Sequence, residues 1–552
     1  MKTVFHISIY QLIFILFIYS SSVTGQNLEH EINGYLSAKF DTAKPGLSIL
    51  VAKDGKAIYA KGFGMANMEL DVKVEPKHVF EIGSITKQFT AVSILMLKEQ
   101  GKLSLDDEIT KYIPDYPTQG KTITIHNLLN HTSGIKSYTN LPSFMELART
   151  DMTPLELIDK FKNEPMEFDP GTKFNYNNSG YIILGYIIEK ITEMSYAQFI
   201  EKEIFETLNM TDSYYGSMVD IIPNRASGYS QTQSGYRNAD YLSLTLPYAA
   251  GSIMTTTSDL LKWQNAISEN TLISESSLKM ATNGSTLNNG ESIPYGYGWI
   301  KTNLAGSRTY EHGGGIFGYT SNGIYLPTEN IYVIGLTNCD CGDVNGLVRT
   351  VAAMAMGKPF PTISDAIRLS ESEMKRWVGA YQFDEGVVRH VTLSENQLYS
   401  QREGSTKLKI FPLSKTRFFF GGTDTYYEFY NNDKGERMAK FTASGEAIEG
   451  RETDKSPPAE KVSVELSEDV LKDYVGKYEL QPNFHIDIRL KDVGVFAQAT
   501  GQPEFQIFAS EKDKFYLKVV PAEIMFNRNS KNEVESLTLF QNGQEMPGKK
   551  IN

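Results

Sequence analysis

The chain has 552 residues, more than one ordinary hydrophobic core accommodates, so roughly two to four domains are expected. Its composition is that of folded protein, with 41% hydrophobic and 22% charged residues. The 66 acidic residues outnumber the 54 basic ones and give a net charge of −12. This excludes a general electrostatic attraction to nucleic acid or to anionic membranes, and we expect neither as a partner.

The first 25 residues have the layout of a cleavable signal peptide. Lys2 supplies a positive charge, an apolar run covers residues 12–18, and small or polar residues fill 20–25. The alternative is an anchoring helix, but the run is well short of the about 20 residues that a membrane span needs. We therefore predict removal of residues 1–25. The mature chain is then expected to have no membrane span and to be periplasmic or secreted.

Residues 26–360 are predicted to form one large α/β (α+β) domain. Hairpins are expected at 46–59, around an Asp-Gly turn, and at 323–335. Apolar residues recur at helical spacing in three segments between them: 86–100, 179–193 and 258–268. Gly101 stands where the first of these helices needs a C-terminal cap. Strands at both ends with helices between them predict one sheet, built from distant segments and packed against a helical region.

The pattern S-x-x-K occurs at 84–87, and also at 276–279 and 372–375. In a helix these two positions share a face, so the amine lies beside the serine hydroxyl and can accept its proton if burial lowers the lysine pKa. The pattern is common by chance, and the last two matches are interpreted as surface helix. Only Ser84 follows a glycine bend, which places it at a helix N-terminus. Free backbone N–H groups there favour developing negative charge.

A second candidate motif is Tyr176-Asn177-Asn178, which follows a Pro-Gly turn. Tyr176 could serve as a phenolate acid/base beside Lys87, and Asn178 could orient a substrate amide. Asn178 or Ser179 is also expected to cap the following helix. The alternative interpretation of Tyr176 is a half-buried loop aromatic.

A third candidate motif is the run His312-Gly313-Gly314-Gly315. Consecutive glycines let a backbone approach a ligand closely. A strand edge of this kind could bind an extended acyl group and complete an oxyanion hole. Taken alone, His312 is an ordinary histidine before a turn.

Cysteine and histidine usage argues against a metal site or a disulfide scaffold. Cys339 and Cys341 are one residue apart, so a bond between them would be strained, and free thiols at a strand end are the favoured interpretation. The eight histidines show no paired metal-ligand spacing. We expect neither a metal nor a cofactor.

The C-terminal part contains an internal repeat at an offset of 97 residues (475 − 378). Val378-Gly379-Ala380-Tyr381 recurs as Val475-Gly476-Lys477-Tyr478. The same offset relates three further pairs: Ile410-Phe411 with Ile507-Phe508, Arg417-Phe418-Phe419 with Lys514-Phe515-Tyr516, and Phe429 with Phe526. Each copy alternates apolar and polar residues, and the recurring aromatics favour core packing over a binding face. We predict two small antiparallel β-barrels, at 372–453 and 463–552, joined by a linker at 454–458.

The order S-x-x-K, Y-x-N, H-x-G resembles the penicillin-recognising serine hydrolases of the class C β-lactamase-like branch. Three flanking segments also match: Leu128-Leu129-Asn130-His131-Thr132-Ser133-Gly134, Asp259-Leu260-Leu261-Lys262-Trp263 and Tyr295-Gly296-Tyr297-Gly298-Trp299. The resemblance covers residues 35–345. It implies a β-lactamase/transpeptidase-like catalytic domain, followed by barrels similar to those of some D-aminopeptidases.

The resemblance also implies roles for the matched residues. Ser84 would be the acylated nucleophile, Lys87 its proton partner and Tyr176 the acid/base of acylation and deacylation. Asn178 would hold the substrate. The backbone N–H groups of Ser84 and Gly315 would form the oxyanion hole.

One departure from the family pattern concerns the substrate. His312-Gly313-Gly314 stands where β-lactamases have Lys-Thr-Gly. That lysine is a permanent cation facing the substrate carboxylate, whereas a histidine is only partly charged near neutral pH. The departure argues against efficient β-lactam hydrolysis.

The expected function is that of an exported hydrolase that forms an acyl-enzyme with small-molecule or peptide amides or esters. D-amino-acid peptides and peptidoglycan fragments are the expected substrates. The alternatives are an esterase or weak β-lactamase on the same site, and a non-catalytic penicillin-binding or sensor protein. An α/β-hydrolase is disfavoured because the chain lacks a G-x-S-x-G elbow.

Overall fold

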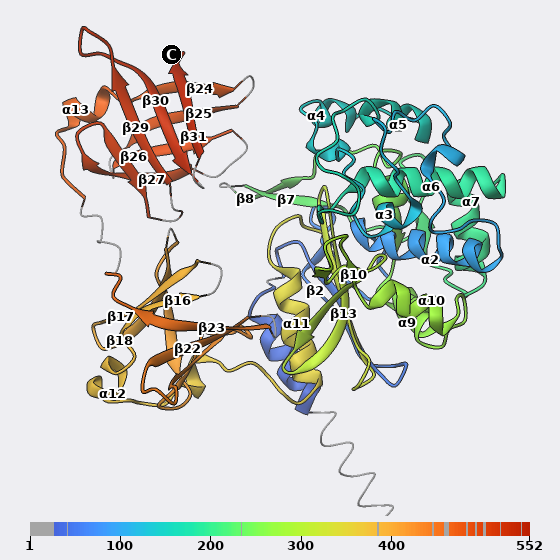
Figure 1. The fold of residues 1–552 in the computed structure, drawn as a ribbon, viewed down its shortest axis with the longest axis horizontal. Helices are drawn as coiled ribbons and strands as arrows, with labels where there is room; N and C mark the ends of the chain where they lie inside the picture. The colour runs from blue at the N-terminus through green and yellow to red at the C-terminus, as the bar shows by residue number, and fades with distance from the viewer. Residues whose placement is uncertain are drawn as a thin grey trace, which may run out of the picture. The chain divides into compact units, whose positions relative to one another are not determined.

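The computed structural model describes residues 27–551 except 41, 233–234, 384–385, 404, 444–445, 457–462, 482–483, 492–493, 501–503, 519, 521 and 542–543. Two compact units divide near Phe360 (Figure 1). The predicted signal peptide and part of the predicted linker lie outside the described residues. In the part of the chain that is described, no helix is long and apolar enough to cross a membrane.

A six-stranded antiparallel sheet forms the centre of the first unit, in the order β12-β13-β14-β15-β1-β2. Its strands are β1 (Leu47–Lys53), β2 (Lys56–Phe63), β12 (Ile300–Leu304), β13 (Ser307–Ile316), β14 (Tyr319–Leu326) and β15 (Ile331–Thr337). Both predicted hairpins are present. Strand β1 pairs with β15, which places Leu47 opposite Thr337. The prediction of one sheet built from distant segments is confirmed.

The sheet has a hydrophobic core on each face. Alternate residues of β1 point to opposite sides, so Ile49 and Val51 contribute to one core and Leu50 to the other. The first core is completed by the helix at residues 27–37 and by α11 (Val344–Ala355). Most of the helical region lies on the opposite face (Figure 1). This double burial explains the uninterrupted apolar run of β1.

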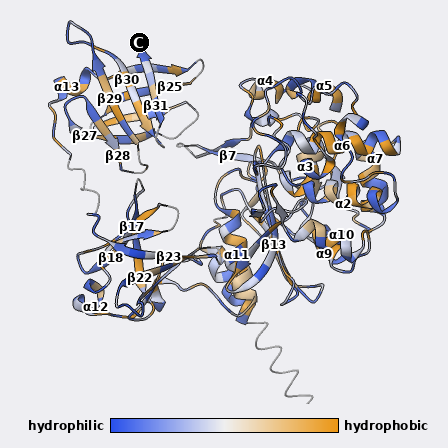
Figure 2. Ribbon diagram, in the orientation of Figure 1, coloured by the Kyte–Doolittle hydropathy of each residue, from blue (hydrophilic) through white to orange (hydrophobic). Residues whose placement is uncertain are grey.

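Helix α2 (Thr86–Glu99) lies in the middle of the helical region, and 11 of its 14 residues are buried. Figure 2 shows hydrophobic residues concentrated along α2 and its neighbours. The other helices are α3 (Ile125–Leu129), α4 (Phe144–Leu147), α5 (Pro154–Phe161), α6 (Asn178–Thr192), α7 (Tyr196–Ile200), α8 (Tyr248–Gly251), α9 (Thr257–Ser268) and α10 (Glu275–Thr282). The three helices expected from apolar spacing are therefore confirmed, and Gly101 adopts a left-handed φ of 71° after α2.

Short strands and single turns complete the first unit. The strands are β3 (Met65–Asn67), β4 (Val72–Lys73), β5 (Phe80–Glu81), β6 (Tyr214–Tyr215), β7 (Tyr229–Thr232), β8 (Gly235–Asn238), β9 (Ile253–Thr255), β10 (Ser285–Thr286) and β11 (Ser292–Ile293). The turns are the 3₁₀ segments η1 (Gly83–Ile85), η2 (Ile109–Lys111) and η3 (Tyr138–Asn140) and the π turn η4 (Glu201–Glu206).

Two closed eight-stranded barrels form the second unit. The first contains β16 (Gly379–Phe383), β17 (Val388–Ser394), β18 (Gln397–Arg402), β19 (Leu408–Pro412), β20 (Arg417–Phe419), β21 (Tyr426–Asn431), β22 (Arg437–Ala443) and β23 (Glu446–Thr453). The second contains β24 (Gly476–Gln481), β25 (Phe484–Lys491), β26 (Gly494–Ala499), β27 (Glu504–Glu511), β28 (Lys514–Leu517), β29 (Ala522–Arg528), β30 (Val534–Gln541) and β31 (Gln544–Lys550). The turn η5 (Ile363–Asp365) precedes the first barrel.

The barrels confirm the internal repeat. Helix α12 (Glu371–Lys375) and strand β18 recur at an offset of 97 residues as α13 (Glu468–Lys472) and β26. The matched tyrosines make the same contact, since the Tyr381 hydroxyl donates to the Trp377 carbonyl and the Tyr478 hydroxyl to the Tyr474 carbonyl. The four aromatic residues in these two contacts are all buried, as expected for core packing.

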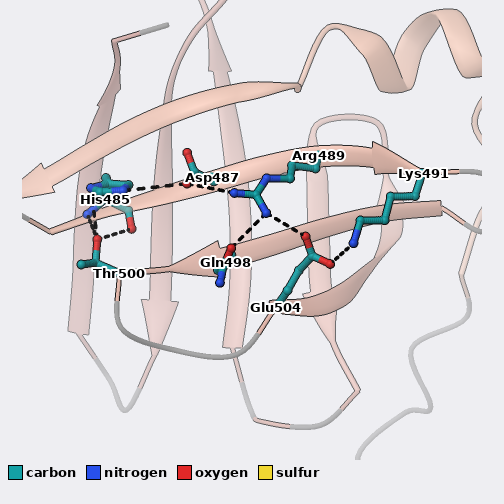
Figure 3. A network of polar contacts seen from close by, with 7 residues as sticks. All are labelled: His485, Asp487, Arg489, Lys491, Gln498, Thr500 and Glu504. Atoms are coloured by element: carbon teal, nitrogen blue, oxygen red, sulfur yellow. Dashed lines mark hydrogen bonds and ion pairs between the residues drawn. The ribbon is translucent and has the colours of Figure 1, made fainter. Parts of the chain in front are cut away.

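Strand β25 shows how each barrel strand separates its two faces. Ile486 and Ile488 point into the core, whereas Asp487 and Arg489 point outward into a polar network (Figure 3). The Arg489 guanidinium donates to Gln498 at 3.0 Å and lies 3.4 Å from Asp487. The outward side chains are thus satisfied by one another on the barrel surface.

The prediction of free thiols is wrong, because Cys339 and Cys341 form a disulfide. Strand β15 ends at Thr337, and the chain bends after it. The bend brings the two Cα atoms to 5.0 Å, within the usual range for a disulfide, whereas an extended strand would hold them about 6.6 Å apart.

Candidate active site

A glycine bend places Ser84 at the start of the buried helix. Gly83 has a φ of +52°, and the turn η1 carries the chain from β5 into α2. A Cβ atom on Gly83 would lie 2.9 Å from the backbone nitrogen of Gly315, so only glycine allows this approach. The predicted bend is present, and it brings β13 against the residue before Ser84.

Lys87 is fully buried, and its amine contacts three oxygen atoms. Nζ lies 3.0 Å from Ser84 Oγ, 2.8 Å from Asn178 Oδ1 and 2.9 Å from the carbonyl oxygen of Ala250. Burial holds its pKa well below the usual value of 10.5, which shifts the balance toward the neutral amine. Two N–H groups of that amine satisfy the two carbonyl oxygens. Its lone pair is then left for the hydroxyl hydrogen of Ser84.

Tyr176 is the second titratable group at this point, and its ring centroid lies 4.9 Å from Lys87 Nζ. Its phenol oxygen is buried and has no hydrogen-bond partner among the described residues. Burial raises the pKa of Tyr176, and the nearby Ser84 hydroxyl lowers it by less. The phenol is therefore the favoured form in this state, in place of the expected phenolate.

The residue that caps α6 is Asn177, one position before the predicted Asn178 or Ser179. Asn177 Oδ1 accepts a hydrogen bond from the Gly180 amide at 2.8 Å, and the Asn177 amide donates to His131 Nδ1 at 3.1 Å. These contacts fix Asn177 facing inward. Asn178 is then free to face Lys87, and its amide nitrogen donates to Thr139 Oγ1 at 3.2 Å.

His312 is buried and neutral. Its Nδ1 lies 2.6 Å from the Gly313 carbonyl, which requires the proton on Nδ1, so Nε2 accepts from the Tyr295 hydroxyl at 2.9 Å. Burial, reinforced by the nearby Lys87, lowers the pKa of His312 to about 4. The His312 ring was expected to be partly charged near neutral pH. This expectation is wrong, because protein encloses both ring nitrogens.

The glycines after His312 have different surroundings. Gly313, Gly314 and Gly315 pair with Asn322, Ser321 and Thr320 of β14. A Cβ on Gly314 would lie 1.9 Å from the Ile82 carbonyl oxygen, so this glycine lets β13 pack against the bend before Ser84. Gly315 has nothing within 4 Å of its Cβ position and borders open space.

That space is a cavity of about 370 Å³, with Ser84, Asn178 and Gly315 in its wall. Much of the remaining wall is apolar: Phe144, Leu242, Leu246, Pro247, Ile316 and Phe317. Lys87, Tyr176, His312, Gly313 and Gly314 are not part of the wall. The structure thus brings the predicted residues together in two layers. Ser84, Asn178 and Gly315 line the cavity, and the proton-transfer groups of Lys87 and Tyr176 lie behind them.

The S-x-x-K matches at 276–279 and 372–375 are surface helix, as predicted. Ser276 and Lys279 lie in α10, and Ser372 and Lys375 in α12. Both lysines are exposed and pair with a glutamate of their own helix at 2.6 Å. Within the described ranges, no group of three histidine, cysteine, aspartate or glutamate side chains could hold a metal ion.

Comparison with known proteins decides the family, since the β-lactamase family profile matches residues 29–354. The chain belongs to the β-lactamase family. Penicillin-binding protein 4* of Bacillus subtilis (strain 168) is 31% identical to it over 423 residues, which are 71% of this chain and 91% of that protein. A second profile, a domain of unknown function named DUF3471, matches residues 460–550, the region of the second barrel.

Solved structures of related proteins agree with this β-lactamase family assignment. An octameric penicillin-binding protein homologue from Pyrococcus abyssi is 29% identical with a TM-score of 0.53, over 77% of this chain and 99% of that one. A D-stereospecific amidohydrolase from Streptomyces sp. is 26% identical with a TM-score of 0.51, over 61% and 98%. The predicted family and fold class are confirmed, and the protein is a serine hydrolase.

Several residues around the site were not singled out by sequence. The Ala250 carbonyl holds Lys87, His131 holds the backbone of Asn177, and Asp340 lines the cavity. His131 and Tyr295 lie in segments that match the family, which was the available signal. A backbone carbonyl such as that of Ala250 leaves no signal, because every residue has one.

Proposed function

We propose that this protein is an exported hydrolase that cleaves amides or esters through an acyl-enzyme on Ser84. The buried amine of Lys87, 3.0 Å from Ser84 Oγ, is the observation that carries the proposal. A serine hydroxyl needs a neighbouring base to become a nucleophile. Lys87 is the only nitrogen base that contacts Ser84 Oγ among the described residues.

In the acylation step, Ser84 Oγ attacks the substrate carbonyl as its proton moves to the Lys87 amine. The new C–O bond turns the carbonyl oxygen into an oxyanion. The backbone N–H groups of Ser84 and Gly315 are proposed to bind this oxyanion. Losing one such donor typically costs about 2.7–4 kcal/mol of transition-state stabilisation.

The tetrahedral intermediate collapses when the bond to the leaving group breaks. The departing nitrogen or oxygen needs a proton, and the buried phenol of Tyr176 is proposed to supply it. The Lys87 ammonium then restores the proton of Tyr176. In deacylation, water attacks the ester of Ser84 and gives a proton to this pair, which returns it to Ser84 Oγ as the acid product leaves.

The similarity to a D-stereospecific amidohydrolase supports amides, with D-amino-acid peptides or peptidoglycan fragments as the proposed substrates. Neutral His312 supports weak β-lactam hydrolysis at most, because no cation stands at the position of the β-lactamase lysine. The alternatives are an esterase or weak β-lactamase and a non-catalytic penicillin-binding or sensor protein. Export rests on the pattern of residues 1–25, and cleavage would leave Gln26 as the first residue.

A panel of chromogenic substrates tests the proposal. Wild type and Ser84→Ala are compared on D-alanyl p-nitroanilide, p-nitrophenyl acetate and a chromogenic cephalosporin. We expect the wild type to cleave the anilide and the acetate and to react slowly with the cephalosporin. The turnover rate of Ser84→Ala should be at least about 10³-fold lower. Turnover that Ser84→Ala leaves unchanged, or none by the wild type, would contradict the proposal.

The pH dependence of Ser84 reactivity is expected to follow Lys87 rather than His312. Labelling by a fluorophosphonate should rise with pH and level off well below pH 10.5, since the neutral Lys87 amine accepts the proton. His312, whose pKa burial lowers to about 4, is neutral at and above neutral pH. His312→Gln should therefore leave the midpoint of the labelling profile unchanged. A midpoint that moves with this substitution would make His312 the controlling group.

A further inference from the structure

The cavity beside Ser84 has one carboxylate in its wall, that of Asp340, and no basic side chain. Lys87 and His312 are enclosed behind the wall, and burial favours the neutral form of both. Asp340 is therefore the one carboxylate that a ligand in this cavity meets among the wall residues. Such a cavity repels a substrate carboxylate and attracts a cation.

Asp340 is held firmly in place. It lies between the bonded cysteines, and its amide donates to the Tyr229 carbonyl at 3.1 Å. Oδ2 accepts hydrogen bonds from Ser230 Oγ at 2.6 Å and from the Gly318 amide at 3.1 Å. Oδ1 accepts no hydrogen bond from a described residue, and the side chain is exposed to the cavity. One oxygen anchors the carboxylate and the other is free for a ligand.

A nearby cation does not neutralise Asp340 by direct pairing. Arg237 is close enough for the Asp340 charge to raise its pKa, but its guanidinium binds Asp240 with two hydrogen bonds of 3.0 and 2.8 Å. The stronger effect on the Arg237 pKa comes from Asp240. The Arg237 guanidinium is therefore engaged by Asp240, and the Asp340 carboxylate stays available to a ligand.

The sheet register places the end of β15, which Asp340 follows, two strands away from Gly315. Gly315 of β13 is opposite Thr320 of β14, and Thr320 is opposite Thr337 at the end of β15, three residues before Asp340. Two strand spacings separate Gly315 from the end of β15, which is about 10 Å. Two extended residues span about 7 Å, and an ammonium–carboxylate contact adds about 2.8 Å. A dipeptide acyl group with a free N-terminus therefore has the length that reaches from Gly315 to the end of β15.

We propose that Asp340 binds the free ammonium group of the substrate, so that the site prefers short peptides with an unblocked N-terminus. The proposal rests on the function proposed above and names the substrate class for that site. The apolar wall accommodates small hydrophobic side chains, and Oδ1 of Asp340 accepts the ammonium hydrogen bond. N-acylated peptides lose this contact.

Binding to the Ser84→Ala protein tests this inference without requiring turnover. The ligands are D-alanyl-D-alaninamide and its N-acetyl derivative, measured by calorimetry. We expect the free amine to bind at least tenfold more tightly than the acetylated ligand. Adding Asp340→Asn, which keeps the shape and the hydrogen-bond acceptor but removes the charge, should reduce this ratio to within twofold.

Asp343→Asn is the matched control. It removes the same charge three residues away, outside the cavity wall, and asparagine still caps α11 as Asp343 does through the Gly346 amide. The tenfold ratio should persist in this variant. Equal binding of the two ligands, or a ratio that survives Asp340→Asn, would overturn the inference. The turnover panel judges the proposed function separately, since it depends on Ser84 and not on this ratio.

Discussion

Replacing Lys87 by methionine is expected to reduce Ser84-dependent turnover by about 10²–10⁴-fold, the range that a positioned general base contributes. The amine is fully buried and contacts Ser84 Oγ, and methionine fills a similar volume without a proton acceptor. The measurement is kcat/KM for the substrate that the wild type cleaves best, with circular dichroism to verify folding.

The two surface lysines provide matched controls for this experiment. Lys279→Met and Lys375→Met remove the same group from the same S-x-x-K pattern, but at exposed helix positions. Both variants should keep the wild-type rate. If Lys87→Met kept more than one tenth of the wild-type kcat/KM, a proton-accepting role for this amine would be contradicted.

Replacing Arg349 by methionine is expected to destabilise the first unit by about 3–5 kcal/mol, the usual effect of breaking a buried ion pair. Arg349 NH1 of α11 lies 2.7 Å from Glu311 Oε1 of β13, and their side chains are only 7% and 9% exposed. NH2 also donates to the Asn303 carbonyl at 2.7 Å. The substitution leaves the Glu311 carboxylate buried without its cation, directly before His312. Urea unfolding followed by tryptophan fluorescence measures the loss.

A double variant separates the ion pair from general packing. Arg349→Met combined with Glu311→Leu removes both charges and should recover most of the lost stability. Lys375→Met, which breaks the exposed pair with Glu371, should cost less than about 1 kcal/mol. A loss for Arg349→Met as small as that of Lys375→Met would show that the buried pair contributes little.

The parts of the site that were predictable depend on short sequence spacing or on motif order. Ser84 and Lys87 share a helix face because they are three residues apart, and the Gly83 bend distinguishes this pair from the two surface matches. The barrels were predictable for a similar reason, since one offset of 97 residues relates every matched segment. A fixed spacing or a fixed offset can be read from the sequence without knowing which segments contact one another.

The parts that were missed depend on contacts between distant segments. Asn177 and Asn178 are chemically identical, and contacts with the distant segment that contains His131 and Ile135 accompany the inward turn of Asn177. The bend after β15 that joins Cys339 to Cys341 has no periodic signal. Asp340 became interpretable only once the sheet placed the end of β15 beside the cavity.

Trapping the covalent intermediate tests the central claim most directly. The wild type is mixed with an activated ester such as p-nitrophenyl acetate, quenched with acid within the first turnovers, digested and analysed by mass spectrometry. We predict one acyl group per chain, located on Ser84 and absent from Ser84→Ala. Turnover without an adduct, or an adduct on another residue that persists in Ser84→Ala, would contradict the assignment of Ser84 as the nucleophile.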